Sequence, residues 1–316
     1  MQTILVTGGA GFIGSHIVNL LIAQGYRVIV LDNLHTGSQA DIHPAATFIP
    51  GDVRSKDDID RAFAEGIDAV IHLAGQASIK LSYSDPAHDL TVNTYGTINL
   101  LQACLVHRVQ RFLFASSMTI YGNPTTVPTP ETAPANPVSY YGITKYAAER
   151  YVHLTGERTD LTTPLRVTSF RMFNVYGERQ SLTNPYQGVL AIFIGRLHRR
   201  EEIVIHSDGE QARDFVYVGD VARAWVDALD CEATYGQVIN LGTGTPTSVN
   251  RLCDAALAAV GETRRTYAIR YAPAQLGDLR VSAADISRAK DILGWQPTVS
   301  LDVGMQRTLD WARSNA

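Results

Sequence analysis

Residues 3–16 read TILVTGGAGFIGSH, and this stretch decides the fold. It starts with a β-branched apolar run typical of a buried strand and ends in the apolar pattern of a helix. Between the two, Gly9, Gly11 and Gly14 match G-x-G-x-x-G. The alternative pattern G-x-x-G-x-x-G is matched by Gly8, Gly11 and Gly14. Glycine permits a tight turn and lets a pyrophosphate approach the helix N-terminus. The order strand, glycine turn, helix therefore predicts a dinucleotide-binding unit.

The same alternation continues outward through the first half of the chain. Further strand-like runs occupy residues 27–31, 69–73, 111–115 and 165–171, and helical patterns occupy 12–24, 56–63, 89–107 and 139–155. Parallel strands need crossover connections, which helices normally supply. We therefore predict an α/β fold with a Rossmann-type doubly wound parallel sheet.

The second half is expected to contribute a smaller region. We assign residues 1–174 to the NAD-binding Rossmann domain, rejoined by about 214–243, because residues 237–241 have the texture of another buried strand. Residues 175–213 and 244–316 are expected to form a smaller α/β substrate-binding region over the carboxyl edge of the sheet, where open α/β sheets bind ligands. The segment 123–137 contains five prolines and is either a stiff surface loop or one wall of a site.

Composition excludes several classes of protein. The 316 residues are 45% hydrophobic and 18% charged, with a net charge of −4 and no basic run longer than Arg199–Arg200, so nucleic acid is not expected as a partner. Three scattered cysteines predict neither a disulfide framework nor a metal site. With no leader pattern and no apolar run of about 20 residues, we expect a cytoplasmic protein that does not bind a membrane.

Two acidic residues lie where an adenosine would bind. Asp32 ends the second strand, 18 residues beyond Gly14, and its carboxylate suits ribose hydroxyls but repels a 2′-phosphate. It has no basic neighbour, which favours NAD over NADP. Asp52 follows the third apolar run and is expected to contact the adenine amino group, although an ordinary helix cap is the alternative.

A catalytic pattern opens the helix expected over residues 139–155. Tyr141 and Lys145 are four residues apart and share a helical face. We expect the ammonium to lower the pKa of the phenol, which makes Tyr141 a base near neutrality. Ser117 ends a strand on the ligand edge, where its hydroxyl can bond a substrate oxygen. Tyr-x-x-x-Lys alone also occurs on solvated helix faces, but its combination with the glycine turn and Ser117 favours catalysis.

Eight motifs together carry a family resemblance: TGGAGFIGSH, LDNLHTG, HLAGQAS, FASSMTIYG, YYGITK, RMFNVYG, GEQARDFVYVGDVA and LGWQP. The chain resembles the extended short-chain dehydrogenase/reductase family, most of all its UDP-glucose 4-epimerase branch, over nearly its whole length. The resemblance implies a tightly held NAD, a UDP-sugar substrate, and a homodimer packed through helices of the first domain.

The resemblance also implies a mechanism. Tyr141 would take the proton from the sugar 4-hydroxyl while the C4 hydride passes to the nicotinamide, with Ser117 bonded to the same oxygen and Lys145 holding the nicotinamide ribose. The 4-keto sugar would then rotate and take the hydride back on its other face. The implied cofactor contacts are Gly8, Gly11, Phe12, Ile13, Gly14, Asp32, Asn33, Asp52, Val53, Leu73, Ala74, Asn93, Tyr141, Lys145 and Phe173.

The substrate residues are assigned in the same way. They are Ser117, Tyr141, Asn174, Val189, Leu190, His206, Arg213, Asp278, Arg280 and Ser282. Arg213 suits a diphosphate because its planar guanidinium donates in pairs; an ion pair with Asp214 is the alternative.

Five positions are compared with relatives of this scaffold. Met118 and Thr119 replace the acids of sugar-nucleotide dehydratases and decarboxylases, which disfavours elimination and decarboxylation. His206 stands where an aromatic often stacks on uracil. Gln275 replaces a phosphate-binding Arg, for which Arg280 is our substitute. A small Ser282 leaves room for a 2-acetamido group, so N-acetyl substrates are expected as well.

Three alternative functions remain open from the sequence. One is another sugar-nucleotide epimerase, such as a UDP-glucuronate 4-epimerase. The second is an NDP-sugar reductase, which Asp32 disfavours because such an enzyme uses NADPH. The third is a nucleotide-binding protein without catalysis, which the presence of Ser117, Tyr141 and Lys145 disfavours.

Overall fold

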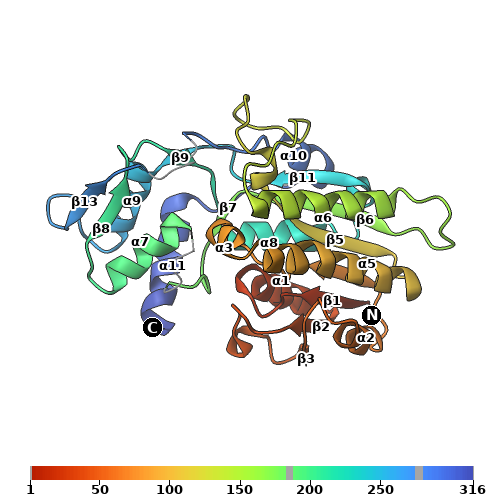
Figure 1. Ribbon diagram of the computed structural model, residues 1–316. Helices are drawn as coiled ribbons and strands as arrows, with labels where there is room; N and C mark the ends of the chain where they lie inside the picture. Colours follow the sequence, from red (N-terminus) through yellow and green to blue (C-terminus); the bar gives the residue numbers. More distant parts are fainter. Residues whose placement is uncertain (1, 183–187, 275–279, 316) are drawn as a thin grey trace.

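The structure is a computed structural model that describes residues 2–182, 188–274 and 280–315. Figure 1 shows a large lobe with helices on both faces of a central sheet and, beside it, a smaller lobe that contains the C-terminus.

Seven parallel strands form the central sheet, in the order β11-β6-β5-β4-β1-β2-β3. They are β1 (Thr3–Thr7), β2 (Arg27–Asp32), β3 (Thr47–Pro50), β4 (Ala69–His72), β5 (Arg111–Ser117), β6 (Arg166–Met172) and β11 (Gln237–Leu241). The chain winds in one direction from β1 to β3 and in the other from β4 to β11. The predicted doubly wound α/β fold is confirmed, and the reversal beside β1 is where such sheets hold ligands.

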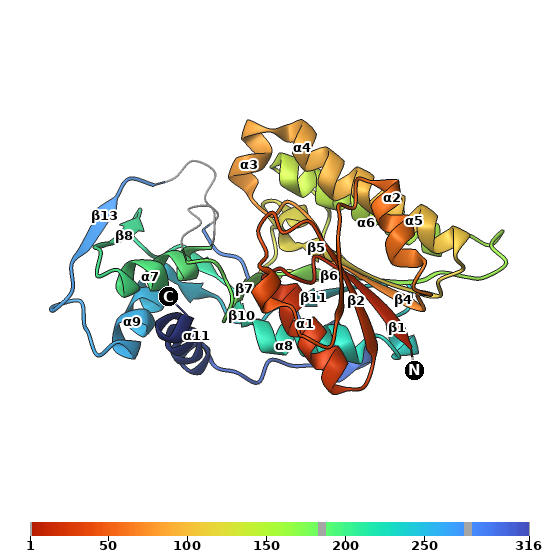
Figure 2. The ribbon, with the colours of Figure 1, turned by 90° about the horizontal axis from the view of Figure 1, so that it is seen from below.

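Helices cover both faces of this sheet (Figure 2). On one face lie α1 (Phe12–Ala23), α8 (Val218–Asp227) and α10 (Ser287–Leu293), and on the other α2 (Lys56–Phe63), α5 (Gly96–Val106) and α6 (Tyr140–Gly156). Each face of the sheet packs with its helices into an apolar core. Alternate side chains of a strand enter the two cores, because Ile4 and Val6 of β1 lie in one and Leu5 lies in the other. Since α10 packs on the first of these cores, the range 244–316 contributes to both lobes; the proposed domain boundaries stay a prediction.

The expected helix over 89–107 is interrupted. The chain runs through α3 (Ile79–Ser84) and α4 (Pro86–Leu90), then through a π-helical segment, η2 (Thr91–Tyr95), before α5. Such π segments are often found at functional sites, and this one carries Asn93. A hydrophobic pattern at 3.6-residue spacing does not reveal one widened turn, so this π-helical segment could not be predicted from the sequence.

Short strands and three helices build the smaller lobe. The pairs are β7 (Asn174–Tyr176) with β10 (Phe215–Tyr217), β8 (Ile203–His206) with β13 (Ile269–Ala272), and β9 (Ala212–Arg213) with β12 (Thr247–Ser248). The helices are α7 (Val189–His198), α9 (Val249–Ala259) and α11 (Leu301–Asn315), which share an apolar core with β8 and β10.

The proline-rich segment 123–137 is tied down at its centre. Thr129 is buried, its N–H donates to the carbonyl of Ala283 at 2.8 Å, and its carbonyl accepts from the N–H of Asp285 at 3.0 Å. Glu131 accepts from the N–H of Asn240 in β11 at 2.8 Å. The segment therefore packs against the stretch 281–285, which contains Ser282, and is more than a surface loop.

Candidate active site

The glycine turn between β1 and α1 leaves no room for side chains. Gly8 has φ +73, and a Cβ there would lie 2.6 Å from the backbone nitrogen of Ala74; a Cβ on Gly14 would lie 2.1 Å from the Gly8 carbonyl oxygen. Gly11 precedes α1 without any side-chain cap, which leaves the first N–H groups of the helix available. This cradle fits the pyrophosphate of a dinucleotide.

Asp32 lies at the end of β2 beside this turn. Its carboxylate accepts from the N–H of Ala10 at 3.0 Å and from the N–H of Leu34 at 2.8 Å. Burial raises the pKa of Asp32, and these two hydrogen bonds oppose that rise. The carboxylate therefore has a fixed orientation at the position where a ribose would bind.

Asp52 is held next to Asn33, the residue after Asp32. It accepts from Asn33 Nδ2 at 2.9 Å and from the guanidinium of Arg54 at 2.7 Å, and the hydrogen bonds from Arg54 hold its pKa well below the usual range. Ser55, whose hydroxyl accepts from the N–H of Asp58, caps α2. The alternative reading of Asp52 as the helix cap is therefore wrong.

The other predicted cofactor residues surround the same edge. Leu73 and Ala74 follow β4, and both their N–H groups donate to the carbonyl of Thr7 at 3.0 Å. Val53 and Phe173 are buried, while Phe12 and Ile13 form the first turn of α1. The structure thus brings these residues together at the carboxyl edge of the sheet, around the glycine turn.

Three catalytic candidates come together at the same edge of the sheet, one from β5 and two from α6. Ser117 ends β5, while Tyr141 and Lys145 lie in the first turns of α6, with a hydrogen bond between Ser117 and the Tyr141 side chain. Lys145 is buried, and its Nζ lies 4.4 Å from the centre of the Phe114 ring. A phenol, a hydroxyl and an ammonium group are therefore side by side.

The low pKa expected for Tyr141 is not found in this structure. Burial raises the pKa of Tyr141 to about 12, which outweighs the hydrogen bond from Ser117, and the negative charge of Asp89 raises it further. Burial also lowers the pKa of Lys145 to about 8, against the opposing effect of Asp89. At Tyr141, loss of hydration outweighs the hydrogen bond from Ser117, and at Lys145 it outweighs the attraction of the nearby acids, so the charged form of each group is disfavoured.

A buried polar cluster behind these residues was missed from the sequence. The carboxylate of Asp89 accepts from Thr144 Oγ1 at 2.6 Å, from Gln76 Nε2 at 2.7 Å and from Asn93 Nδ2 at 3.0 Å. Thr144 lies inside the YGITK motif, which was a usable signal. Asp89 and Gln76 carried no signal, because only the fold brings them to the start of α6.

On the substrate side, the structure brings Asn174 and Ser282 together around Met118. Met118 directly follows Ser117 in the chain. Asn174 Nδ2 lies 3.9 Å from Met118 Sδ, and Ser282 Oγ lies 3.6 Å from the same atom. The two positions after Ser117 are Met118 and Thr119, so neither carries a carboxylate. The Thr119 hydroxyl donates to Ser117 Oγ at 3.0 Å.

The remaining substrate candidates are spread along the smaller lobe. Val189 and Leu190 begin α7, with Leu190 in the lobe's core. His206 ends β8, and its Nδ1 lies 3.1 Å from the Pro273 carbonyl oxygen. Asp278, like Gln275, lies outside the described residues.

Two arginines lie on neighbouring segments in this lobe, Arg213 in β9 and Arg280 beside it. Arg213 in β9 donates to the Ala212 carbonyl oxygen at 2.9 Å. The carbonyl of Arg280 accepts from the N–H of Ala212 at 2.8 Å, and its guanidinium contacts both carboxylate oxygens of Asp208 at 2.8 and 3.0 Å. Asp214 accepts from the N–H and hydroxyl of Thr243 at 2.7 and 2.6 Å.

The doubly wound sheet, the glycine cradle, the ribose-binding position of Asp32 and the Ser–Tyr–Lys cluster define a dinucleotide-dependent oxidoreductase-type scaffold. Comparison with known proteins gives the particular family. The chain belongs to the NAD dependent epimerase/dehydratase family, whose model matches residues 4–242.

Individual relatives match over almost the whole chain. The UDP-glucose 4-epimerase of Mycolicibacterium smegmatis is 37% identical, with 99% of each chain covered. The crystal structure of UDP-glucose 4-epimerase from Thermotoga maritima with UDP-glucose is 40% identical, with a TM-score of 0.93 over 99% of each chain. That of Thermus thermophilus UDP-glucose 4-epimerase with NAD is 37% identical, with a TM-score of 0.90 over 100% of each chain.

Within the described ranges, every helix is too short or too polar to cross a membrane.

Proposed function

We propose that this chain is an NAD-dependent 4-epimerase that interconverts UDP-glucose and UDP-galactose through a 4-keto intermediate. The observation that carries the proposal is the Ser117–Tyr141–Lys145 cluster at the edge of a dinucleotide cradle, with Met118 and Thr119 in place of further acids. The relatives named above, which match the chain from end to end, support the same activity.

The chain's own residues have separate tasks in this reaction. Gly8, Gly14 and Asp32 would hold NAD, which when bound exchanges hydride with the sugar C4. Tyr141 takes the proton of the 4-hydroxyl and later returns it, while Ser117 fixes the same oxygen. Lys145 holds the nicotinamide ribose and, in its ammonium form, favours the phenolate.

The high pKa of Tyr141 affects the timing of this step. With a pKa of about 12, almost no phenolate exists at neutral pH before the reaction. The 4-hydroxyl becomes much more acidic as hydride leaves its carbon, so we infer that proton transfer accompanies hydride transfer rather than preceding it.

Several substrate contacts belong to the same proposal. Arg213 and Asn174 would bind the diphosphate, with Arg280 supplying the second cation, and His206 would lie against the base. Ser282 is buried beside Met118. Its small side chain supports turnover of UDP-N-acetylglucosamine in addition to UDP-glucose.

The experiment that tests the activity needs no added cofactor. Purified protein is incubated with UDP-glucose, UDP-N-acetylglucosamine and UDP-glucuronate in separate tubes, and the products are identified by proton NMR. We expect inversion at C4 of the first two without net formation of NADH. Conversion of UDP-glucuronate alone would favour the uronate epimerase. Product formed only in a parallel tube with added NADPH, with stoichiometric loss of that NADPH, would favour the reductase.

The Tyr141→Phe variant tests the assigned base. General acid–base groups typically contribute about 10²- to 10⁴-fold to a rate, so turnover should fall by that range. The variant should keep its NAD, read from the extracted nucleotide. Normal turnover would remove Tyr141 from the mechanism.

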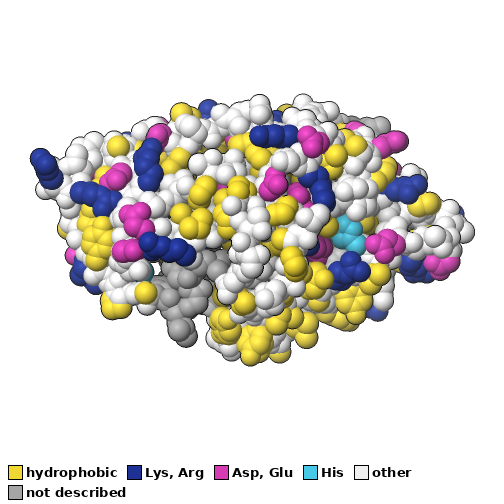
Figure 3. All heavy atoms as spheres, turned by 90° about the horizontal axis from the view of Figure 1, so that it is seen from above, with side chains coloured by type: hydrophobic (Ala, Val, Ile, Leu, Met, Phe, Trp, Pro, Cys, Tyr) yellow, Lys and Arg dark blue, Asp and Glu magenta, His cyan; other side chains and the backbone are white. Residues whose placement is uncertain are grey.

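We also propose that two copies of the chain pair through the face formed by α3–α6. Figure 3 shows apolar side chains gathered along one edge of the molecule, on the side where Figure 2 places these helices. Tyr151 and Leu154 of α6, Leu90 of α4 and Val106 of α5 are all about half exposed or more. Such a patch is typical of an interface between subunits. The cytoplasmic location stays a prediction.

A further inference from the structure

Glu149 is a buried acid on the catalytic helix that the mechanism above does not use. It follows Lys145 by four residues and Tyr141 by eight, so the three side chains share one face of α6. Glu149 Oε2 accepts from Ser116 Oγ at 2.6 Å, and its two oxygens accept from Arg171 at 2.6 and 3.0 Å. All of its contacts are therefore to charged or polar groups inside the fold.

These contacts join the catalytic helix to both strands beside it. Ser116 precedes Ser117 at the end of β5, and Arg171 lies directly opposite Ser116 in β6. Arg171 is itself held, because its guanidinium lies 4.8 Å from the centre of the Tyr121 ring. Glu149 thus fixes α6 against the strand end that carries the substrate-binding hydroxyl.

This arrangement is not explained by stability. Glu149 is only 2% exposed and Arg171 only 6%. A buried ion pair pays a large desolvation cost, and replacing such a pair by apolar residues of similar volume is often neutral or stabilising. What an ion pair with two-point geometry provides, and an apolar contact does not, is a fixed relative position.

We propose that Glu149 is a positioning residue that, through Ser116 and Arg171, sets where Tyr141 and Lys145 stand relative to Ser117. The inference rests on the proposed 4-epimerase activity for its kinetic part only. Small displacements at a reacting centre cost much of the rate, because proton and hydride transfer need aligned partners.

Glu149 also affects the charge of Lys145. The charged and titratable groups that face Lys145 are Asp89 from α4, Glu149 from its own helix and His72 from β4; the two acids raise its pKa against the effect of burial. Removing the negative charge of Glu149 should lower the pKa of Lys145 below its value of about 8.

Three variants separate positioning from folding. Glu149→Gln removes the charge but keeps the shape. The double variant Glu149→Met with Arg171→Met replaces the ion pair by apolar residues, which should keep the stability in urea close to that of the wild type. His153→Phe is the control, because His153 makes a similar buried contact one helical turn further along α6, to Ser169 at 2.9 Å.

In the kinetic arm, kcat should fall at least tenfold in Glu149→Gln and in the double variant, with the KM for UDP-glucose within about twofold. His153→Phe should keep its kcat. A double variant that is stable and turns over at the wild-type rate would overturn the proposal, as would a loss of kcat that merely follows the folded fraction.

The second arm needs no substrate. The chain contains only four lysines, Lys56, Lys80, Lys145 and Lys290, so the ¹³Cε resonance of Lys145 can be assigned with a Lys145→Met variant and titrated in each protein. The Lys145 midpoint should move to lower pH in Glu149→Gln and stay unchanged in His153→Phe. An unchanged Lys145 titration midpoint in Glu149→Gln contradicts the role of Glu149, even if the chain proves to epimerise no UDP-sugar. A shifted midpoint in a protein whose wild type is inactive would contradict the proposed function alone.

Discussion

In the proposed reaction, we expect the size of Ser282 to affect which sugars fit. Its hydroxyl lies 3.6 Å from Met118 Sδ and the side chain is 2% exposed, so a larger group there must displace its neighbours, Met118 among them. We expect Ser282→Tyr to lose at least ten times more activity on UDP-N-acetylglucosamine than on UDP-glucose. The measurement is kcat/KM for both substrates, with Ser282→Ala as the control that keeps both activities. Equal losses on the two sugars would contradict this role.

His72 makes the folded chain sensitive to acid. It is buried in β4, where its Nδ1 lies 2.7 Å from Thr7 Oγ1 and its Nε2 2.9 Å from Thr97 Oγ1, and burial lowers its pKa to about 3. Between about pH 6.5 and pH 3, the unfolded chain binds a proton here that the folded chain does not, so stability falls as the pH falls.

The size of this effect is about 1.4 kcal/mol per pH unit. We expect urea unfolding at pH 7, 6 and 5 to show a steeper loss of stability for the wild type than for His72→Gln, which has no titrating group but retains a donor and an acceptor. The comparison uses slopes, so a lower overall stability of the variant does not affect it. Parallel slopes would show that His72 is not the group responsible.

The sequence predicted the side chains of the proposed catalytic cluster but not their protonation. Ser117, Tyr141 and Lys145 stand in motifs whose spacing alone places them at one edge of the sheet. Their pKa values depend instead on burial and on Asp89, which lies more than 50 positions before Tyr141 and reaches it only through the fold. A local pattern therefore predicts which groups meet, while the surrounding elements decide how they titrate.

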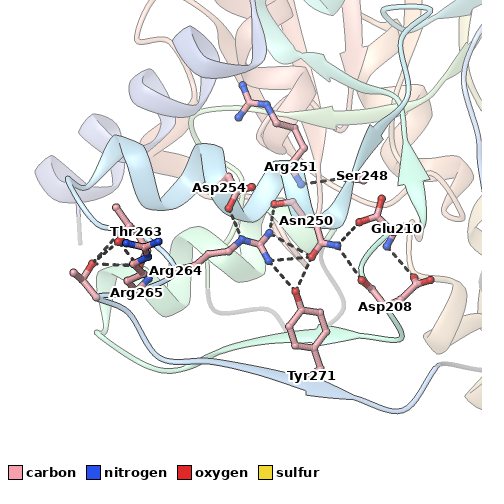
Figure 4. Close-up of polar contacts among 11 residues, drawn as sticks. Asp208, Glu210, Ser248, Asn250, Arg251, Asp254, Thr263, Arg264, Arg265 and Tyr271 are labelled. Carbon is pink, nitrogen blue, oxygen red and sulfur yellow. Dashed lines mark hydrogen bonds and ion pairs between the residues drawn. The ribbon is translucent and has the colours of Figure 1, made fainter.

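At the scale of elements, the N-terminus of α9 holds the turn that leads to Arg213 (Figure 4). Asn250 Nδ2 donates to the Asp208 carbonyl at 2.9 Å and to Glu210 Oε1 at 2.5 Å. A Cβ on Gly209, which has φ +75, would lie 2.4 Å from the same amide, so the turn and the helix fit without spare room.

We expect Asn250→Ala to raise the KM for UDP-glucose roughly tenfold, equivalent to about 1.4 kcal/mol, while kcat changes less than twofold. The turn would lose two hydrogen bonds, and with them the fixed position of Arg213, but the catalytic cluster lies in the other lobe. Arg251→Ala is the matched control on the same helix, because Arg251 pairs only with the exposed Asp302 at 2.8 Å and does not contact the turn. A KM that rises equally in both variants would point to α9 as a whole rather than to Asn250.

Long periodic elements could be predicted from the sequence, and short ones could not. The strands of the central sheet other than β3, and helices such as α1 and α2, were predicted within a residue or two, because their apolar spacing is regular. By contrast, β9 and β12 have two residues each, and β8 pairs with β13, some 60 positions later. Such strands exist only through their partners, so no local signal marks them.

At the scale of the whole molecule, the net charge of −4 conceals local sites for anions. The uncapped N-terminus of α1 and the arginines Arg213 and Arg280 of the smaller lobe are such sites. Each acts at short range, where neighbouring groups outweigh the distant acidic surface because salt screens charges beyond about 8–10 Å. Overall charge therefore excluded nucleic acid as a partner without arguing against a diphosphate ligand.

We expect two copies of the chain to assemble through the apolar face over α3–α6. Ile143, Tyr151 and Leu154 form one exposed stripe along α6, whose opposite side covers the sheet through Ala148 and Val152. Light scattering after size exclusion should give twice the 34.5 kDa mass of one chain. Because interface cores exclude charge, Tyr151→Glu with Leu154→Glu should halve this mass. Val303→Glu, at a similarly exposed apolar position on α11, should leave it unchanged. A wild type that elutes as a monomer, or a dimer that persists in the double variant, would mean that this face does not join two subunits.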